Sequence, residues 1–402
     1  MIKADLLITG ASEVVTCDES LGEVGTGRIE RGAVAVAGET IIWVGPQSEL
    51  RNSVSINPDA LLIDANATAV IPGFVDAHTH MVFGGTRREE FAARAKGQPY
   101  DTGGILQTVD ATRRAPREDL LNATMTRGRV MLAHGTTTAE AKSGYALDAE
   151  GELRLLEILG EVHTKGTLDL EITFLGAHAL PSEYHSADEF VEAFGEMLEL
   201  CAPAARWCDV FCDIGAFTPP QATTILKAGK KMGLIPRIHA NELGPSGGAE
   251  VAVSVGAASA DHLLHLTPLQ ARNLARAGCV GVLCPTTALG LGRFADARMM
   301  RAEKMTIALA SDLNPGTAYG ENLQFAIAIA TRAMGMGPSE ALMAATRGSA
   351  ASLRRDDIGR IAPGCLADIL VLGTDSHLDL GYHAGVNLVA SVIKRGRLCD
   401  FK

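Results

Sequence analysis

Histidine and aspartate recur where short apolar runs end in the middle of the chain. His78 and His80 stand two residues apart at the end of one run, His239 lies in a later run, and Asp312 follows another. Residues i and i+2 of an extended strand point to the same side, so His78 and His80 can face one ion. Imidazole and carboxylate suit Zn²⁺ or Fe²⁺. The pattern therefore predicts one divalent metal ion, Zn²⁺ or Fe²⁺, held by His78, His80, His239 and Asp312.

Three further polar residues occupy comparable positions. His178 ends the third run, Glu242 follows His239 by three residues, and His262 lies in the sixth run. Each histidine taken alone would more often be a core or surface residue. Their joint placement favours a hydrolytic site, because a bound metal ion lowers the pKa of a water molecule. Asp312 or His262 would then accept the proton of that water.

The elements that must position these residues are strands alternating with helices. Helical periodicity predicts helices over 118–134, 149–163, 187–200, 219–232 and 267–278. The eight apolar runs are AVIPGFVDAHTH, GTTTAEAKSGY, LEITFLGAHA, WCDVFCDIGAF, IPRIHANEL, SADHLLHL, CVGVLCPTTA and TIALASDLNPG. Eight strand–helix units predict the α/β class and a parallel (β/α)₈ TIM barrel, in which all strand carboxyl ends meet at one mouth. A doubly wound sheet is the alternative, since strand order cannot be read from sequence.

The two ends of the chain have a different character. Short β-like runs broken by glycine, such as DLLITGASEVVT and GAVAVAGETIIWVG, precede the first polar cluster. CLADILVLG and LVASVIKRGRL repeat this style near the end. We predict that residues 1–70 and 352–402 pair into a small β-sandwich, and that residues 71–351 form the metal-dependent catalytic barrel.

Composition excludes several classes of protein. The 402 residues are 47 % hydrophobic and 21 % charged, with a net charge of −11. This balance excludes a disordered chain and disfavours a nucleic-acid partner. No apolar stretch is long enough to span a membrane, and the short first apolar run carries Asp5, which is unlike a signal peptide. The eight scattered cysteines, among them Cys208 and Cys212 in an apolar run, predict buried reduced thiols and a cytoplasmic location.

Several motifs resemble those of a known family. PGFVDAHTH, the later HANE, the DH of the sixth run and the SD of the eighth resemble the amidohydrolase superfamily, as does the closing stretch IGRIAPGCLADILVL. Within it, the chain resembles the imidazolonepropionases. The stretches that carry this resemblance are HTHMVFGGTRREEF, GGILQTVDATR, HGTTTAEAKSGY, FLGAHALPSEY, IHANELGPSGGAE, ASADHL and SDLNPGT.

The resemblance implies an activity and a set of roles. It implies hydrolysis of the cyclic amide of 4-imidazolone-5-propanoate to N-formimidoyl-L-glutamate, in histidine degradation, by a homodimer. It implies the same four metal ligands and places His262 beside the attacking water. The substrate contacts that it implies are Arg87, Tyr100, Tyr145, His178, Glu242, Asn314, Gly316 and Thr317.

The chemistry of these residues agrees with such a substrate. Arg87 offers a planar fork for a carboxylate tail. Tyr145 can supply a hydroxyl and an aromatic wall, and His178 can polarise the ring carbonyl. Glu242 can hold a ring nitrogen and move protons. A single metal ion is expected, because the fourth run contains no lysine to bridge two ions and Lys142 is placed after the second run.

Two segments depart from the family pattern, and two other functions stay open. The segment after Tyr100 is short, and CPTTALGLGRFADARMM lacks the aromatic residues common in the family. A related cyclic-amide hydrolase or a ring deaminase of the same superfamily is therefore the alternative. A scaffold that has lost its metal is disfavoured, because every candidate ligand is present.

Overall fold

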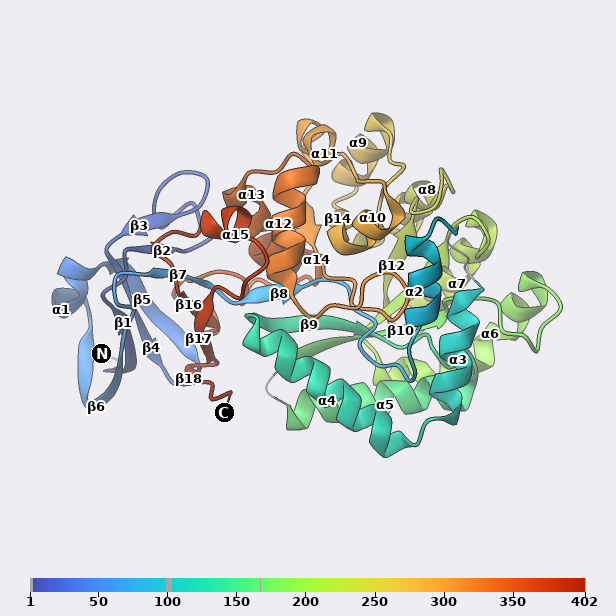
Figure 1. The fold of residues 1–402 in the computed structure, drawn as a ribbon, viewed down its shortest axis with the longest axis horizontal. Helices are drawn as coiled ribbons and strands as arrows, with labels where there is room; N and C mark the ends of the chain where they lie inside the picture. Colours follow the sequence, from blue (N-terminus) through green and yellow to red (C-terminus); the bar gives the residue numbers. More distant parts are fainter. Residues whose placement is uncertain (1–2, 99–102, 167, 402) are drawn as a thin grey trace.

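The computed structural model describes residues 3–98, 103–166 and 168–401. Figure 1 shows a helix-wrapped barrel with a group of sheets at one side, formed by the two ends of the chain. Among the described residues, none of the helices combines the length and apolar character needed to cross a membrane.

The barrel is an eight-stranded parallel sheet whose strands follow one another in chain order from β8 to β15. A bridge between Thr79 and Leu313, next to the first and last strands, joins the two edges of the sheet. The predicted TIM barrel is thereby confirmed, and the doubly wound alternative is wrong. The strands are β8 (Phe74–Asp76), β9 (Thr136–Lys142), β10 (Asp169–Ala177), β11 (Trp207–Cys212), β12 (Ile235–Ala240), β13 (Ser259–His262), β14 (Val280–Leu283) and β15 (Ile307–Leu309).

The longer predicted helices are present on the outside of the barrel. They are α4 (Arg117–Ala133), α5 (Ala149–Lys165), α6 (Ala187–Cys201), α7 (Pro219–Lys231) and α9 (Pro268–Arg276). Local sequence sets their starts: the side chains of Asp148 and Ser186 accept backbone N–H groups at the first turns of α5 and α6. Their apolar faces, including Leu155, Leu156 and Phe190, are buried in the core.

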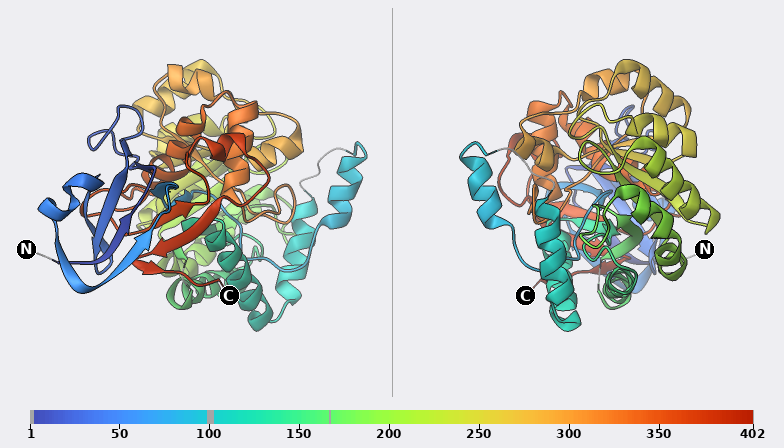
Figure 2. Two further views of the ribbon diagram at one scale, coloured as in Figure 1. Left: turned by 60° about the vertical axis from the view of Figure 1, so that its left-hand side comes forward. Right: turned by 90° about the vertical axis from the view of Figure 1, so that its right-hand side faces the viewer.

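Further helices complete the mouth and the outer layer. They are α2 (Arg88–Ala95), α3 (Gly104–Arg114), α8 (Gly248–Val255), α10 (Pro285–Leu291), α11 (Ala297–Ala302), α12 (Leu323–Ala333), α13 (Pro338–Met343), the π-helical turn η3 (Ala344–Gly348), α14 (Ser349–Ser352) and α15 (Asp379–Tyr382). Short helical turns η1 (Gln47–Glu49), α1 (Leu50–Ser53) and η2 (Ala202–Ala204) lie elsewhere. Figure 2 shows α2 projecting from the body of the barrel, in keeping with the absence of buried residues along this described helix.

Two further sheets lie beside the barrel. One has the order β5-β4-β1-β6, and the other has the order β18-β17-β16-β7-β2-β3, which combines strands from both ends of the chain. Their bounds are β1 (Lys3–Thr9), β2 (Glu13–Val15), β3 (Arg28–Glu30), β4 (Gly32–Ala37), β5 (Thr40–Pro46), β6 (Ser55–Asp64), β7 (Ala69–Pro72), β16 (Ile369–Leu372), β17 (Val389–Lys394) and β18 (Arg397–Leu398). Buried Val14, Val34, Val70 and Ile393 are part of one apolar cluster between the sheets.

The first predicted apolar run divides between two sheets. Its beginning is β7 of the six-stranded sheet, and its continuation is β8 of the barrel. Gly73 lies between them, and a Cβ atom there would stand 2.3 Å from the Thr137 hydroxyl oxygen. Only glycine permits this close approach, so the passage from one sheet to the other is fixed by a single residue.

Candidate active site

Four side chains at the barrel mouth converge on one point. His78 and His80 follow β8, His239 lies in β12 and Asp312 follows β15. The Nε2 atom of His80 is 3.2 Å from that of His78 and 3.3 Å from that of His239. Asp312 Oδ1 is 3.5 Å from His78 Nε2 and 3.6 Å from His80 Nε2. The structure thus brings together the four residues that the sequence suggested as metal ligands.

The protonation of this cluster suits a cation. Burial is the main cause that lowers the pKa of both His78 and His80 well below the ordinary value, so each imidazole is neutral and keeps a lone pair. Asp312 Oδ1 is buried and accepts no hydrogen bond from any described residue. A buried carboxylate oxygen of this kind is costly unless something compensates its charge. A divalent cation among these four atoms would do so, and the donor set fits one.

A layer of carboxylates beneath the cluster orients two of the imidazoles. His78 Nδ1 is 2.7 Å from Asp261 Oδ2, and His239 Nδ1 is 3.1 Å from Asp209 Oδ2. Lys142 Nζ lies 2.8 Å from Asp209 Oδ2 and is itself completely buried. The hydrogen bond between Asp261 and His78 Nδ1 fixes the tautomer of His78 that leaves Nε2 unprotonated, which is the form a metal ion requires. The charge of Asp209 beside His239 Nδ1 favours the same tautomer of His239.

Asp312 is fixed by its other oxygen and by its backbone. Thr287 at α10 donates its hydroxyl to Asp312 Oδ2. Burial raises the pKa of Asp312 to about 6, although the hydrogen bond from Thr287 opposes this effect. Asp312 and His262 have φ values of 52° and 73°, in the left-handed region that non-glycine residues seldom adopt. Such strain persists where surrounding structure holds a functional geometry.

A small pocket opens beside the four converging side chains. Its aromatic wall includes Tyr145 and Phe211, with His178 between them: ring centroids of His178 lie 5.2 Å from Tyr145 and 6.2 Å from Phe211. His178 Nδ1 is 2.9 Å from the Gly144 carbonyl oxygen, and burial lowers the pKa of His178 to about 3. Nδ1 of this neutral ring therefore donates to Gly144, and Nε2 is an acceptor.

Arg87 lines the same pocket but also holds a neighbouring carboxylate. Its Nε and Nη2 atoms donate to Glu90 at 2.6 Å and 2.7 Å. Gly316 packs on the guanidinium, since a Cβ atom at Gly316 would stand 2.4 Å from Arg87 Nη1. Arg94 donates to the carbonyl oxygen of Gly316. The arginine is thus oriented by the start of α2 and by the loop after β15.

The loop after β15 is built around one amide. Asn314 Oδ1 accepts the backbone N–H groups of Gly316 and Thr317, both at 2.8 Å. Asn314 Nδ2 donates to the Asp312 carbonyl oxygen at 2.7 Å. Asn314 and Thr317 both line the pocket. The contacts of Asn314 shape the loop that carries Asp312 and faces Arg87.

Glu242 and His262 form the remaining polar side of the pocket. Glu242 Oε1 is 3.6 Å from His262 Nδ1. Burial raises the pKa of Glu242 well above its ordinary value, and the charges of Asp312 and Asp213 act in the same direction. Burial lowers the pKa of His262 well below its ordinary value. The pair therefore contains a carboxylic acid that holds its proton and an imidazole that lacks a second one.

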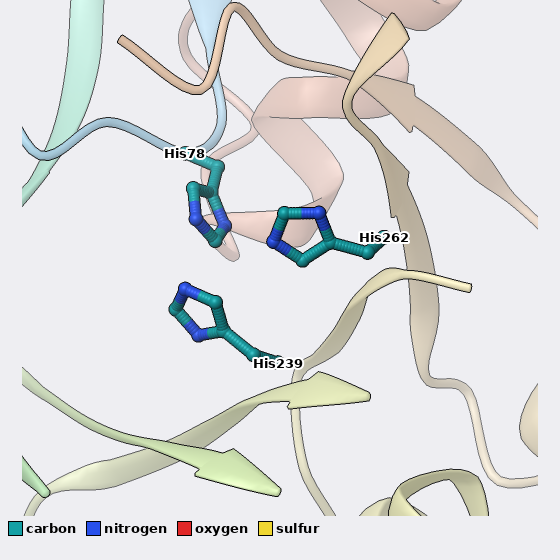
Figure 3. Close-up of side chains that lie close together, drawn as sticks. All are labelled: His78, His239 and His262. Atoms are coloured by element: carbon teal, nitrogen blue, oxygen red, sulfur yellow. The ribbon is translucent and has the colours of Figure 1, made fainter. Parts of the chain in front are cut away.

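Figure 3 shows the rings of His78, His239 and His262 directed toward one another from separate segments of the barrel. The ring centroid of His78 lies 4.5 Å from that of His239 and 5.1 Å from that of His262. His78, His80, His239 and Asp312 thus share one mouth with the buried pair formed by Glu242 and His262.

Comparisons with known proteins agree with this geometry. Residues 69–399 match the model of the amidohydrolase family. The chain is 44 % identical to an imidazolonepropionase of Mycolicibacterium smegmatis, over 98 % of this chain and 97 % of that protein. It is 45 % identical to one of Streptomyces griseus, over 97 % and 98 %. The chain belongs to the imidazolonepropionase family.

More distant members of the amidohydrolase fold resemble this imidazolonepropionase-family chain in structure. An adenosine deaminase from Xanthomonas campestris with bound zinc is 20 % identical, with a TM-score of 0.73 over 100 % of this chain and 95 % of that one. A zinc complex of atrazine chlorohydrolase from Arthrobacter aurescens is 17 % identical, with a TM-score of 0.71 over 98 % and 94 %. At this identity the likeness concerns the fold. The family and the donor set together support a divalent metal ion.

Most of the residues singled out in the sequence lie around this one mouth. His80, Arg87, Tyr145, His178, His239, Glu242, His262, Asp312, Asn314 and Thr317 line the pocket. Gly316 packs against Arg87, and His78 lies just below, against His80. Tyr100 falls outside the described residues. Cys208 and Cys212 are buried thiols in the described structure, as expected.

The layer beneath the imidazoles was missed by sequence reasoning. Lys142 was placed after the second strand, whereas it is the last residue of β9 and pairs with Glu140 and Asp209. Asp209 was not singled out, and Asp261 was quoted only as part of a motif, with no role given to it. A charged residue within a buried run is itself a signal, because burial of an unpaired charge is costly.

Proposed function

We propose that this protein hydrolyses the ring amide bond of 4-imidazolone-5-propanoate to N-formimidoyl-L-glutamate, a step of histidine degradation. The observation that carries the proposal is the convergence of His78, His80, His239 and Asp312 beside a pocket with Arg87 in its wall. The imidazolonepropionases that resemble the chain over nearly its whole length support the same substrate.

The four converging residues would hold one metal ion. His80 Nε2 lies 3.2 Å from His78 Nε2, 3.3 Å from His239 Nε2 and 3.6 Å from Asp312 Oδ1, close enough for these residues to share one cation. We propose Zn²⁺ or Fe²⁺, because both accept neutral imidazole and carboxylate. When bound there, such an ion lowers the pKa of water and polarises a carbonyl oxygen.

Proton transfers are assigned to His262 and Glu242. Both ring nitrogens of His262 lack a hydrogen-bond partner in the described structure, so the ring can accept the proton of the attacking water. Water adds its oxygen to the ring carbonyl carbon, and the carbon–nitrogen bond then breaks. Glu242, which holds its proton through burial, donates it to the departing nitrogen. His262 can return its proton to Glu242 across their 3.6 Å separation.

Substrate orientation is assigned to Arg87 and His178. Arg87 would bind the propanoate carboxylate, and Glu90 would then share or release the guanidinium. The sequence left two roles open for His178, binding of the substrate or polarisation of the ring carbonyl, and a tautomer with Nε2 as an acceptor favours the first. We therefore assign His178 to an N–H group of the substrate ring, with Tyr145 as the wall against which the ring packs.

Two further properties belong to the proposal. The eight cysteines all lie within the described ranges and are free thiols, which supports a cytoplasmic location. The resemblance to the imidazolonepropionases also implies a homodimer, which sedimentation of the purified protein would test.

A turnover assay tests the function. Loss of the ultraviolet absorbance of freshly made 4-imidazolone-5-propanoate is followed for the wild type, Arg87→Ala and Arg88→Ala, with metal content measured on each. We expect rapid turnover by the wild type and by Arg88→Ala, whose side chain is exposed. Arg87→Ala should lose about 10²-fold in kcat/KM while keeping its metal, because a charged hydrogen-bonded pair is lost. A metal-loaded wild type without turnover would overturn the proposal and favour another cyclic amide or an amino-substituted ring.

A further inference from the structure

A second group of possible ligands shares Asp312 with the four converging side chains. The proposed reaction does not use this group as a metal site. His262, Cys284 and Asp312 each place one ligand atom within 4.8 Å of the others, and all three are buried. The group contains a nitrogen, a sulfur and an oxygen donor. Such a mixed set with a thiol favours thiophilic divalent cations, of which zinc and cadmium are the usual examples.

The position of Cys284 directs its thiol to this place. The residue follows β14 directly and precedes α10, at the carboxyl end of a barrel strand. It is 2 % exposed and packs with the small side chains of Ala77, Ala308 and Ala310. These neighbours are themselves in or next to β8 and β15, which flank the four converging side chains. The thiol therefore meets Asp312 and His262 from inside the barrel.

An unpartnered side chain marks the place as suited to a cation. Both ring nitrogens of His262 are buried without a hydrogen-bond partner among the described residues. The carboxylates of Asp312 and Asp261 lie near enough to Cys284 to act on the charge of its thiol. Their negative charge attracts a metal cation, which would displace the thiol proton.

We propose that His262, Cys284 and Asp312 form a second, inhibitory site for a thiophilic divalent cation, adjacent to the first. Binding forms a metal–sulfur bond and releases the thiol proton to solvent. The cation is bound by His262, the base assigned to the attacking water, and by Asp312, a ligand of the first site. Neither residue can then serve the reaction, so hydrolysis stops. The binding part stands on the geometry alone, whereas the inhibition rests on the proposed function.

Cadmium is the probe, because a cadmium–thiolate bond gives an ultraviolet charge-transfer band that imidazole and carboxylate ligands do not give. The full-length protein, loaded with one equivalent of zinc, is titrated with Cd²⁺ while absorbance, bound metal and turnover are recorded. We expect a further equivalent to bind, with the thiolate band and loss of turnover rising together. Cys284→Ala should lose the band, keep its basal turnover, and need about 10–100-fold more cadmium for the same inhibition.

Cys279→Ala is the matched control, because Cys279 is an equally buried thiol just before the other end of β14. It should behave as the wild type. Cys284→Ser nearly keeps the side-chain volume, so it replaces Cys284→Ala in the titration if the alanine variant melts at a lower temperature. A band that persists in both Cys284 variants, or a wild type that gives no band, would overturn the proposal. The band needs no substrate, so its result is independent of the proposed hydrolysis; inhibition that persists without Cys284 would reject the inhibitory role alone.

Discussion

Lys142 supports the imidazoles of His78 and His239 indirectly, through the two carboxylates that lie beside them. Its Nζ atom lies 2.8 Å from Asp209 Oδ2 and 3.9 Å from Asp261 Oδ2. Each of these carboxylates holds the Nδ1 atom of one candidate metal ligand. Burial alone would raise the pKa of Asp209, but Lys142 and His239 hold it well below its ordinary value. The buried charge of Lys142 thus keeps Asp209 ionised beside His239.

Replacing Lys142 with methionine should weaken metal binding by about 10–100-fold, because the residues that orient ligands tune affinity by this amount. The apo protein should also lose about 3–5 kcal/mol of stability, since buried carboxylates are left uncompensated. Competition with a chelator and urea unfolding measure the two effects. Lys165→Met, on an exposed lysine of α5, is the control. An unchanged metal affinity in Lys142→Met would contradict the role given to this residue.

A substitution at Gly316 tests whether the position of the Arg87 guanidinium sets the affinity for substrate. In Gly316→Ala the new Cβ atom would stand 2.4 Å from Arg87 Nη1, so the guanidinium must move. We expect KM to rise about tenfold or more, with metal content unchanged, because a misplaced bidentate donor loses much of its charge-assisted hydrogen bonding. Gly320→Ala is the matched control, since nothing lies within 4 Å of its added Cβ. Equal KM values for the two variants would show that Arg87 does not set substrate affinity.

At the scale of elements, the seam between the first and last barrel strands runs directly through the site. The His80 N–H donates to the Leu313 carbonyl at 2.9 Å, and the Asp312 N–H donates to the His78 carbonyl at 3.1 Å. Three of these residues are candidate metal ligands. A metal ion at their side chains would therefore fasten the two edges of the barrel together.

Metal removal should loosen this seam before it affects the rest of the barrel. We expect faster hydrogen exchange of the His80 and Asp312 amides after chelation, and little change where β10 pairs with β11. Overall stability should fall by about 2.7 kcal/mol relative to metal at one hundred times its Kd. Exchange mass spectrometry of the holo and chelated protein measures both regions. Uniform acceleration across all strands would contradict a local role for the metal.

The strands and helices could be predicted from the sequence more fully than the side-chain pairs that they bring together. Eight apolar runs and the helical periodicity between them predict the barrel because burial on both faces of a parallel sheet leaves a local trace. The pairing of His78 with Asp261 leaves no such trace, because it depends on strand register. Arg87 and Glu90 are only three residues apart, but their pairing beside the pocket depends on where α2 begins. The division of the first run at Gly73 likewise depends on the close approach of Thr137, far along the chain.

At the scale of the whole molecule, one carboxylate links the two ends of the chain. Glu13 in β2 accepts the backbone N–H and Nδ1 of His377 at 2.8 Å and 2.7 Å, and it also pairs with Arg28. Burial would raise the pKa of Glu13, but these hydrogen bonds outweigh it and bring the pKa to about 2. The ionised form is therefore the one that the folded protein favours.

This link predicts a particular dependence of stability on pH. Because the folded pKa of Glu13 lies below its unfolded value of 4.5, its contribution is complete above about pH 5 and disappears as the pH falls toward 2. Relative to Glu13→Gln, the wild type should be more stable by up to about 3 kcal/mol at pH 7, and the difference should shrink through pH 4. Urea unfolding across this range measures it. A difference independent of pH would mean that the charge of Glu13 contributes nothing.

The six-stranded sheet also sets an order of events during synthesis. β7 ends at Pro72 and its neighbour β16 begins at Ile369, so about 300 residues separate the two partners, roughly 15–60 s of translation. Throughout this time the edge of β7 has no β16 to pair with, and an open strand edge invites contact with other chains. All eight barrel strands are therefore synthesised before the neighbouring sheet can close. Nascent chains halted before Ile369 should need a chaperone that full-length chains do not.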